Sequence, residues 1–440
     1  MKNSPVEPKT VHEILSRYIL ADGLDPVFDA ERSHGAYLYD ARTGREFLDL
    51  FSFFATQPIG YNHPKIANDE FRALLGRISV HRPTLSDVYT TEYASFVETF
   101  ARIAGRGLFR YYFFVEGGTL GNENAIKTAF DWKVRKNLAA GRGEKGSQVI
   151  HFHEAFHGRS GYTLSLTNTF DPNKHKYFAK FDWPRITNPK LRFPVDETVL
   201  KETAETEKQA VKEIKEALRK NPHDIAALII EPIQAEGGDN HFRPEFLRQL
   251  RQLADENDFL LIFDEVQTGM GLTGKMWCFE HFGVKPDLLS FGKKAQIAGC
   301  ACTERVDEVK ENVFHVPSRI NSTWGGNLTD MVRCQRYLEI IEEERLVENA
   351  ASVGAYFLSR LEDLARSRSK ISNVRGRGLM IAFDLPDTET RNGLRGAIHK
   401  NGAIILGCGS RSLRLRPHLS FTRENVDQAI DIINKSASTI

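Results

Sequence analysis

The most regular pattern in this chain is a hydrophobic run that ends at a charged residue. The run FLLIF leads into Asp264, DLLSFG leads into Lys293 and Lys294, and IAALII leads into Glu231. An uninterrupted apolar run of this length, bounded by polar residues, is typical of a strand buried on both faces of a parallel sheet. Ligands of open α/β sheets bind beyond the carboxyl ends of the strands, so the pattern predicts that an acid and an amine arrive at one site.

Helical periodicity alternates with these predicted strands. A charged segment over 198–221 carries a narrow apolar stripe, and 244–258 is amphipathic with Pro244 near its first turn. After the run YYFFV, five apolar residues recur at helical spacing: Ala125, Ile126, Ala129, Phe130 and Val134. The alternation of strands and helices predicts an α/β fold around a mostly parallel sheet.

The two ends of the chain follow other patterns. GAYLYDARTGREFLDLF predicts a hairpin that turns at Thr43-Gly44. Beyond about residue 331, one helix (Met331 to Glu342) precedes three strand-like runs, GRGLMIAFDLP, AIILGC and SLRLRPHLSF, and Thr422 is predicted to cap a last helix. These features indicate a smaller α+β unit after the large one.

Composition narrows the class of protein. With 41% hydrophobic and 27% charged residues, the 440-residue chain has the composition of a soluble enzyme with a large core. A formal net charge of +1 gives no reason to expect nucleic acid or an anionic membrane as partner. No run reaches about 18 apolar residues, and the N-terminus lacks an apolar signal segment. The five scattered cysteines argue against a disulfide framework and favour the cytoplasm.

Two groups of residues raise the question of a metal site. Cys300 and Cys302 form a lone CxC pair without a second ligand pair, and His151, His153 and His157 lack a carboxylate at a known ligand spacing. We therefore predict no metal.

Asp264 and Lys293 together suggest a specific cofactor chemistry. Lysine loses its proton readily when desolvated and then forms Schiff bases, and an aspartate can keep a pyridine nitrogen protonated. Pyridoxal phosphate requires this pair of groups. From the spacing alone, however, two surface charges at loop starts are an equally good interpretation, and an aspartate at a strand end also suits magnesium, a helix cap or a general base.

A resemblance decides between these interpretations. DEVQTGMGLTGKM followed by KPDLLSFGK resembles the cofactor signature of the class III (ω-amino acid) aminotransferases. It implies the PLP-dependent transferase fold type I, with a large domain around a mostly parallel sheet and a smaller α+β domain. It further implies that Lys293, seven residues after Pro286, binds the cofactor, that Asp264 pairs with its ring nitrogen, and that Gln267 contacts its phenolic oxygen.

The resemblance extends to the other cofactor contacts. The strand–glycine–helix junction EGGTLGNENAI suits a phosphate, although GG alone also fits a simple tight turn. In the family pattern, Gly118 and Thr119 contact the phosphate and Phe156 of FHGR covers the cofactor ring. Thr323 in SRINSTWGG would reach the phosphate of the other subunit, which implies a homodimer with shared sites. Three parts are implied: an N-terminal segment packing with the small domain (1–60), a large PLP-binding domain (61–330) and a C-terminal small domain (331–440).

Within the family, SFGKKAQ, AFHGRSGYTLSLTN and EPIQAEGGDNHFRPEF most resemble members that use L-lysine. Those enzymes move its ε-amino group to 2-oxoglutarate by a ping-pong mechanism, which gives 2-aminoadipate 6-semialdehyde and L-glutamate. Ornithine, 4-aminobutyrate or a diamine is the alternative donor. A PLP protein that transfers no amino group is a second alternative, against which the intact set of site residues argues.

The same resemblance implies a set of substrate contacts. Glu236 matches a glutamate that pairs with an arginine for one substrate and releases it for the other, and Arg414 is the expected partner with Arg416 as the fallback. Arg159 would hold the distal carboxylate of the substrate, although an interdomain salt bridge also explains it. The remaining candidates for the mouth of the site are Asn321, Ala55, Thr56 and Gln57.

Overall fold

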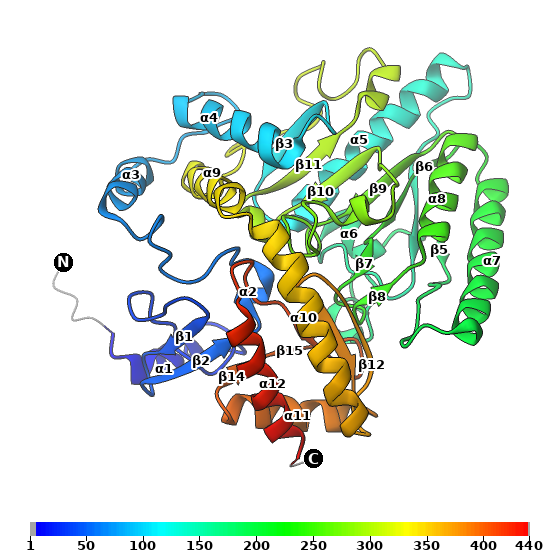
Figure 1. Cartoon of the computed structure of the whole chain (residues 1–440). Helices are drawn as coiled ribbons and strands as arrows, with labels where there is room; N and C mark the ends of the chain where they lie inside the picture. Colours follow the sequence, from blue (N-terminus) through cyan, green and yellow to red (C-terminus); the bar gives the residue numbers. More distant parts are fainter. Residues whose placement is uncertain (1–5, 439–440) are drawn as a thin grey trace.

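The computed structural model describes residues 6–438 and is built around a seven-stranded sheet of order β3-β11-β10-β9-β6-β4-β5 (Figure 1). Its strands are β3 (Tyr111–Val115), β4 (Gln148–Phe152), β5 (Arg185–Ile186), β6 (Ile225–Ile230), β9 (Leu260–Asp264), β10 (Leu288–Phe291) and β11 (Ala298–Cys302). Strand β11 runs opposite to the other six strands of this sheet, which are parallel to one another. The predicted α/β class and mostly parallel sheet are therefore confirmed.

Helices cover both faces of this sheet, because alternate residues of its strands join different cores. Leu261 and Phe263 of β9 pack in the same cluster as Phe246 of α8 (Pro244–Glu256). Leu260 and Ile262 join a second cluster with α5 (Gly118–Ala139). Accordingly β6, β9 and β10 are buried at every position. The charged helix predicted over 198–221 is α7 (Glu197–Lys220), and the short α6 spans Gly161–Leu166.

A second, antiparallel sheet of order β12-β13-β16-β15 forms the C-terminal unit. Its strands are β12 (Ser372–Arg377), β13 (Met380–Asp384), β15 (Leu406–Cys408) and β16 (Ser412–Leu415). Its helices are α10 (Leu346–Ser367), α11 (Thr388–Lys400) and α12 (Arg423–Ala437), whereas α9 (Leu328–Glu343) packs on α3 (Asp69–Ser79) and α4 (Thr91–Phe100). The hydroxyl of Thr422 accepts from Asn425 N and caps α12, as predicted. The sequence interpretation missed α10 and α11.

The N-terminal hairpin is also as predicted. Strand β1 (Tyr37–Asp40) pairs antiparallel with β2 (Arg45–Asp49), and Gly44 in the turn has a φ of 73°. Strand β2 also pairs in parallel with β14 (Ala403–Ile404), so the first and last parts of the chain share one small sheet. The remaining helices of this half are α1 (Val11–Ser16), α2 (Ser52–Ala55), α3 (Asp69–Ser79) and α4 (Thr91–Phe100).

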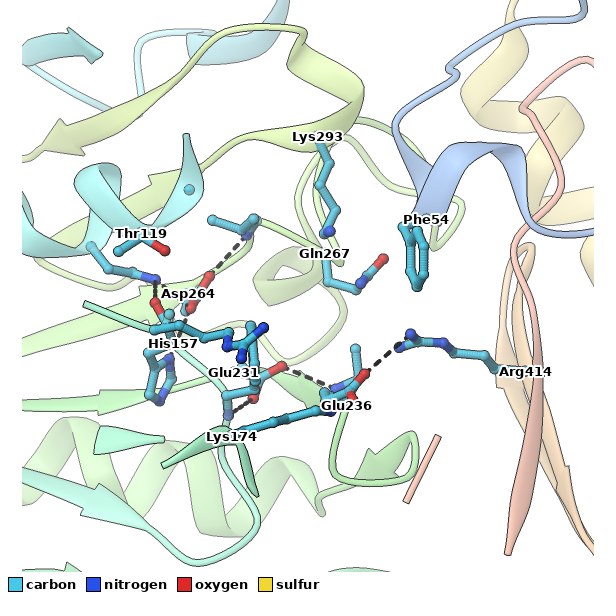
Figure 2. Close-up of a pocket in the computed structure, with 17 residues that line it drawn as sticks. Phe54, Thr119, His157, Lys174, Glu231, Glu236, Asp264, Gln267, Lys293 and Arg414 are labelled. Carbon is cyan, nitrogen blue, oxygen red and sulfur yellow. Dashed lines mark hydrogen bonds and ion pairs between the residues drawn. The ribbon is translucent and has the colours of Figure 1, made fainter. Parts of the chain in front are cut away.

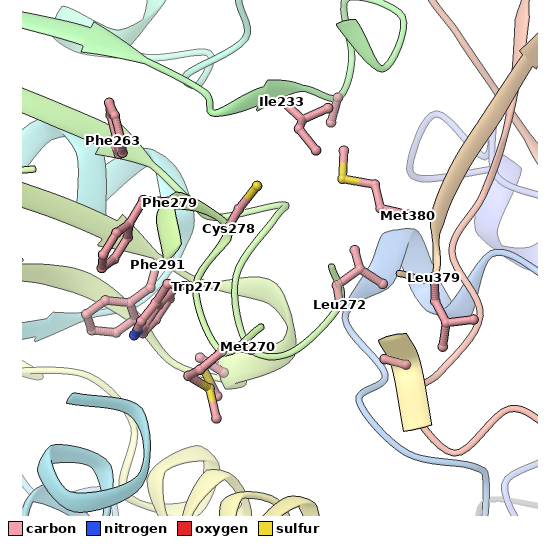
Figure 3. Packing of buried hydrophobic residues seen from close by; sticks show 14 of the residues in the cluster. Ile233, Phe263, Met270, Leu272, Trp277, Cys278, Phe279, Phe291, Leu379 and Met380 are labelled. Carbon is pink, nitrogen blue, oxygen red and sulfur yellow. The ribbon is translucent and has the colours of Figure 1, made fainter. Parts of the chain in front are cut away.

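The large and small units meet through one continuous core. Figure 3 shows Ile233, Leu272 and Met380 close to this junction, and all three belong to the same buried cluster. Leu379 N donates to Leu272 O over 2.9 Å, which joins the backbones of the two units. Across residues 6–438, no helix combines the length and apolarity needed to cross a membrane.

Candidate active site

A cavity of about 340 Å³ lies at the carboxyl ends of the parallel strands, between the large sheet and β16 (Figure 2). Loops after β3, β4, β6, β9 and β10 and the turn of the β7–β8 hairpin (Ile233–Gln234 and Asn240–His241) all reach it. Its lining includes nine of the predicted site residues: Gly118, Thr119, Phe156, Arg159, Glu236, Asp264, Gln267, Lys293 and Arg414.

Lys293 follows directly after β10 and Gly292, in a backbone conformation with a φ of 50°. Its side chain points into the cavity (Figure 2). Burial lowers the pKa of its amine to about 8, and Arg414 acts in the same direction, against Asp264 and Glu236. A buried amine with a reduced pKa is a nucleophile for aldehydes near neutral pH.

Lys294, its neighbour, points away from this cavity and into the protein. Its Nζ donates to the carbonyl oxygens of Ala55 at 3.2 Å and Gln57 at 3.4 Å. Of the two lysines, only Lys293 lines the cavity. The candidates Ala55, Thr56 and Gln57 are absent from the lining, to which the preceding Phe54 contributes instead.

Asp264 ends β9, and three donors orient its carboxylate. Asn122 Nδ2 donates to its Oδ2 over 2.7 Å, and Nδ1 of His157 lies 2.8 Å from the same oxygen. Val266 N donates to its Oδ1 over 3.0 Å. The side chains of Asp264 and His157 are 4% and 0% exposed, so this carboxylate is fixed before any ligand binds.

The N-terminus of α5 forms another wall of the cavity. Gly117 has a φ of 88°, and no acidic residue lies in the first turn of the helix. An added Cβ on Gly118 would lie 2.7 Å from Cγ1 of Val266, so only glycine fits there without displacement. The free backbone N–H groups of this turn and the hydroxyl of Thr119 suit a phosphate.

These groups fit pyridoxal phosphate. The cavity combines a nucleophilic amine, an oriented carboxylate and an anion-binding helix end. Phe156 and Gln267 also line it, and the side-chain amide of Gln267 can donate a hydrogen bond through its Nε2. An aldehyde, a pyridine nitrogen, a phosphate, a flat ring and a phenolic oxygen each find a complementary group here.

Glu231 supports the wall that carries Phe156. Its Oε1 accepts from Phe156 N and its Oε2 accepts from Ala235 N, each over 3.0 Å. Burial raises the pKa of this carboxyl to about 7, although the positive field of His157 opposes the shift. Glu231 therefore has a structural role through these backbone contacts, and it also lines the cavity.

The substrate side of the cavity is dominated by charge. Oε2 of Glu236 lies 3.1 Å from Nη2 of Arg414, and its Oε1 lies 2.5 Å from Nζ of Lys174. Arg414 is 4% exposed, and its Nε and Nη1 have no hydrogen-bond partner in the described part of the chain. Arg416, the fallback, instead pairs with Asp239. Arg159 is exposed at the rim.

Sequence analysis missed several residues of the site: Phe54, Asn122, His157, Glu231, Val266 and Lys174. His157 belongs to the same FHGR motif as Phe156, and this position is a signal in the sequence that it has a role in the site. Asn122 acts 142 residues away from Asp264, and nothing in its local sequence signals that contact.

Asn321 and Thr323 lie away from the cavity of their own chain. Both are exposed, in a loop that packs on residues 82–86, where Leu85 N donates to Trp324 O over 3.0 Å. Arg82 covers the ring of Trp324 at 4.1 Å. A direct role for either residue therefore requires a second chain.

Known proteins share this architecture. The family model described as aminotransferase class-III matches residues 19–436. The L-lysine-epsilon aminotransferase of Mycobacterium tuberculosis is 50% identical over 439 residues, which cover 99% of this chain and 97% of that protein. The protein of the same name from Streptomyces clavuligerus is 47% identical, over 98% of this chain and 94% of its own length.

Solved structures agree with the sequence matches. The lysine aminotransferase from M. tuberculosis in the internal aldimine form superimposes with a TM-score of 0.96 at 49% identity, covering 99% of this chain and 100% of that one. The family match spans nearly the whole chain, and the cavity carries the groups that the cofactor of this family needs. The chain belongs to the class III aminotransferases, which depend on pyridoxal phosphate.

Proposed function

We propose that this enzyme moves the ε-amino group of L-lysine to 2-oxoglutarate, giving 2-aminoadipate 6-semialdehyde and L-glutamate. The observation that carries this proposal is the ion pair between Glu236 and Arg414, which faces the amine of Lys293 across the cavity. The name L-lysine-epsilon aminotransferase, given to relatives that are 47% to 50% identical over nearly the full chain, supports the same donor.

Lys293 is the catalytic residue in this scheme. Bound pyridoxal phosphate supplies an aldehyde that captures the substrate amine and a pyridinium ring that accepts electrons from the broken C–H bond. Lys293 would hold the cofactor through its Nζ at rest and would be free once a substrate amine is bound. Its neutral Nζ would then take the proton from the reacting carbon of the substrate as general base and give it back as general acid.

Asp264 controls the charge of the ring. Its carboxylate, fixed by Asn122 and His157, keeps the ring nitrogen protonated. Phe156 would pack against the ring, Gln267 would contact the phenolic oxygen, and Gly118 and Thr119 would hold the phosphate. Each residue lines the cavity in a position that supports its role.

The two substrates present different charges to Arg414. Lysine reacts at an aliphatic end, and Glu236 then neutralises the arginine. 2-Oxoglutarate reacts beside a carboxylate, which replaces Glu236 on Arg414 and gains its unpartnered N–H groups. Arg159 at the rim holds the distal carboxylate of either substrate.

The site is completed by a second subunit in this proposal. Thr323 reaches the cofactor phosphate of the partner chain, and Asn321 contacts the substrate there. Large apolar side chains exposed on the single chain support a homodimer, among them Tyr18 at 83%, Leu20 at 84% and Tyr89 at 75%. The chain divides, in this proposal, into an N-terminal segment (1–60), a large cofactor-binding domain (61–330) and a small domain (331–440). A cytoplasmic location fits the five free cysteines.

The visible absorbance of the purified holoenzyme tests the donor. Addition of L-lysine should bleach the band of the Lys293-bound cofactor, and 2-oxoglutarate should restore it. L-ornithine and 4-aminobutyrate, added in parallel, should bleach it far more slowly. If only one of those two donors bleached the band, that donor and not L-lysine would be the substrate.

Replacement of Glu236 tests the charge switch separately. The variant Glu236→Ala leaves Arg414 without its internal counter-ion, so the lysine half-reaction should lose much more rate than the 2-oxoglutarate half-reaction. An equal loss in both half-reactions would show that Glu236 does not discriminate between the substrates.

A further inference from the structure

Glu236 is held by two cations rather than one. Arg414 contacts one carboxylate oxygen at 3.1 Å, and Lys174 contacts the other at 2.5 Å. Figure 2 shows the carboxylate of Glu236 between these two side chains along one wall of the cavity. The carboxylate thus bridges a buried guanidinium and a partly exposed ammonium.

The two cations differ in how they are anchored. Arg414 extends from β16, is 4% exposed and carries two nitrogen atoms without a partner among residues 6–438, so it offers a desolvated fork for a carboxylate. Lys174 ends the short 3₁₀ helix η3 (Pro172–Lys174), and its side chain is 23% exposed. A flexible lysine stem with access to water can follow a moving partner, whereas a buried arginine in a sheet cannot.

We propose that Lys174 is a positioning residue for the acceptor half-reaction, which retains Glu236 when the carboxylate of 2-oxoglutarate takes its place on Arg414. This inference rests on the proposed function. The shorter of the two contacts is the one to Lys174. Without Lys174, the carboxylate would keep only one of the two ion pairs that it makes within residues 6–438, and that pair is the one for which the substrate competes.

Charge balance points the same way. Two cations and one anion leave one net positive charge at this wall, which the incoming carboxylate neutralises. Removal of Lys174 leaves no net charge before binding and one uncompensated negative charge afterwards. Lysine brings no carboxylate to Arg414, so the donor half-reaction never needs the displaced position of Glu236.

Two variants at this position separate charge from shape, and a third is a matched control. Lys174→Met keeps the length of the stem without its charge, and Lys174→Arg keeps the charge. Lys176→Met removes an exposed lysine two residues away, whose Nζ lies 4.6 Å from the ring centroid of Tyr177. In Lys174→Met, the KM for 2-oxoglutarate should rise about tenfold more than the KM for lysine. Lys174→Arg should restore most of the ratio, and Lys176→Met should not change it.

Calorimetry with glutarate gives a readout that does not depend on turnover. Glutarate is a dicarboxylate that cannot react, and its Kd for the holoenzyme should rise about tenfold in Lys174→Met. In the background of Glu236→Gln there is no carboxylate to retain, so adding Lys174→Met should cause no further loss. A further loss there would mean that Lys174 binds the dicarboxylate directly and would overturn the proposal, as would an unchanged KM ratio.

Failure of the proposed function gives a different result. A wild-type holoenzyme whose absorbance does not respond to lysine would refute the donor assignment whatever Lys174 does. The glutarate comparison between Lys174→Met and Lys176→Met would still decide whether Lys174 supports a dicarboxylate at Arg414.

Discussion

Lys293, which we propose binds the cofactor covalently, carries an amine with a lowered pKa. Burial lowers its pKa from 10.5 to about 8, because the protonated amine loses hydration and also faces Arg414. Only the neutral amine attacks an aldehyde, so the rate of pyridoxal phosphate incorporation into the apo-protein should rise steeply up to about pH 8 and level off above it. Absorbance after rapid mixing measures this rate. A rate that keeps rising up to pH 10 would contradict the lowered pKa, and Lys293→Ala should incorporate no cofactor covalently.

For Lys294 we expect an effect on stability, because its amine is buried among backbone carbonyl groups. Burial lowers its pKa from 10.5 to about 7, and Arg416 adds to the shift. Between these two values the folded protein binds fewer protons than the unfolded chain, so the free energy of unfolding gains a component that rises with pH. Below pH 7 both states are protonated, and the cost of burying the charge is fully present.

Lys294→Met should therefore flatten the dependence of stability on pH between 7 and 9. Urea unfolding of the holoenzyme at several pH values measures the slope. Lys310→Met, at an exposed lysine, is the matched control and should leave the slope as in the wild type. An unchanged slope in Lys294→Met would mean that another group causes the pH dependence of stability in this range.

Single residues divide clearly into those that the sequence could reveal and those that it could not. Asp264 and Lys293 follow apolar runs, so the strand pattern alone placed them at one edge of a sheet. Asn122, Lys174 and Phe54 carry no such signal, because their function depends on residues far away in the sequence. Lys174 meets Glu236 across 62 positions, through a loop with no regular period.

The junction of β3 and α5 works as one element, since the helix end must approach both the strand and the ligand. An alanine at position 118 would place its Cβ 2.7 Å from Cγ1 and 3.1 Å from Cγ2 of Val266. The first turn must then shift, which misaligns its N–H groups with the phosphate. We expect Gly118→Ala to weaken pyridoxal phosphate binding about tenfold.

A second substitution tests this cause. Val266→Ala removes the two methyl groups that the new Cβ would meet, so the double variant should regain much of the affinity lost by Gly118→Ala. Gly76→Ala in the middle of α3 is the control, because no atom lies within 4 Å of its added Cβ. It should stabilise the protein by up to about 1 kcal/mol without changing cofactor affinity. Equilibrium titration with the cofactor measures all three, and no rescue by Val266→Ala would refute the steric cause.

Elements with a clean period were predicted well, and elements shaped by contacts were not. Helix α10 was missed although Val353, Phe357, Leu361 and Leu364 lie at helical spacing. The turn over 52–55 is a harder case, since its four non-glycine residues have φ values from 40° to 67°. Asp49, Lys294 and Gln296 fix that turn through hydrogen bonds to its backbone and flanks. No local propensity encodes this conformation.

At the scale of the whole molecule, the proposed site requires residues from two chains. Thr323 is exposed and absent from the cavity lining, whereas the residues proposed to share the cofactor with it surround the cavity. Sequence patterns could indicate the order of the elements, but the contact between chains came only from the resemblance. Hydrophobic periodicity does not distinguish a face that packs on its own chain from one that packs on a second copy.

Complementation between two inactive or impaired chains tests whether sites are shared. Lys293→Ala removes the amine from its own site, and Thr323→Ala removes the hydroxyl that we assign to the partner's site. In a heterodimer of these chains, the site that keeps Lys293 also receives the intact Thr323, so one fully functional site forms. Random pairing of equal amounts makes half of the dimers mixed, which restores about a quarter of all sites.

Co-expression of the two variants with different affinity tags allows the heterodimer to be isolated and its lysine half-reaction to be measured. If Thr323 serves the partner, the heterodimer should reach about half of the wild-type activity per dimer, far above either parent. If Thr323 serves its own chain, each site of the heterodimer keeps one defect, and its activity cannot exceed half of that of the Thr323→Ala homodimer. The two arrangements differ only in which chain supplies the hydroxyl, so the ratio of heterodimer to parent activity decides between them.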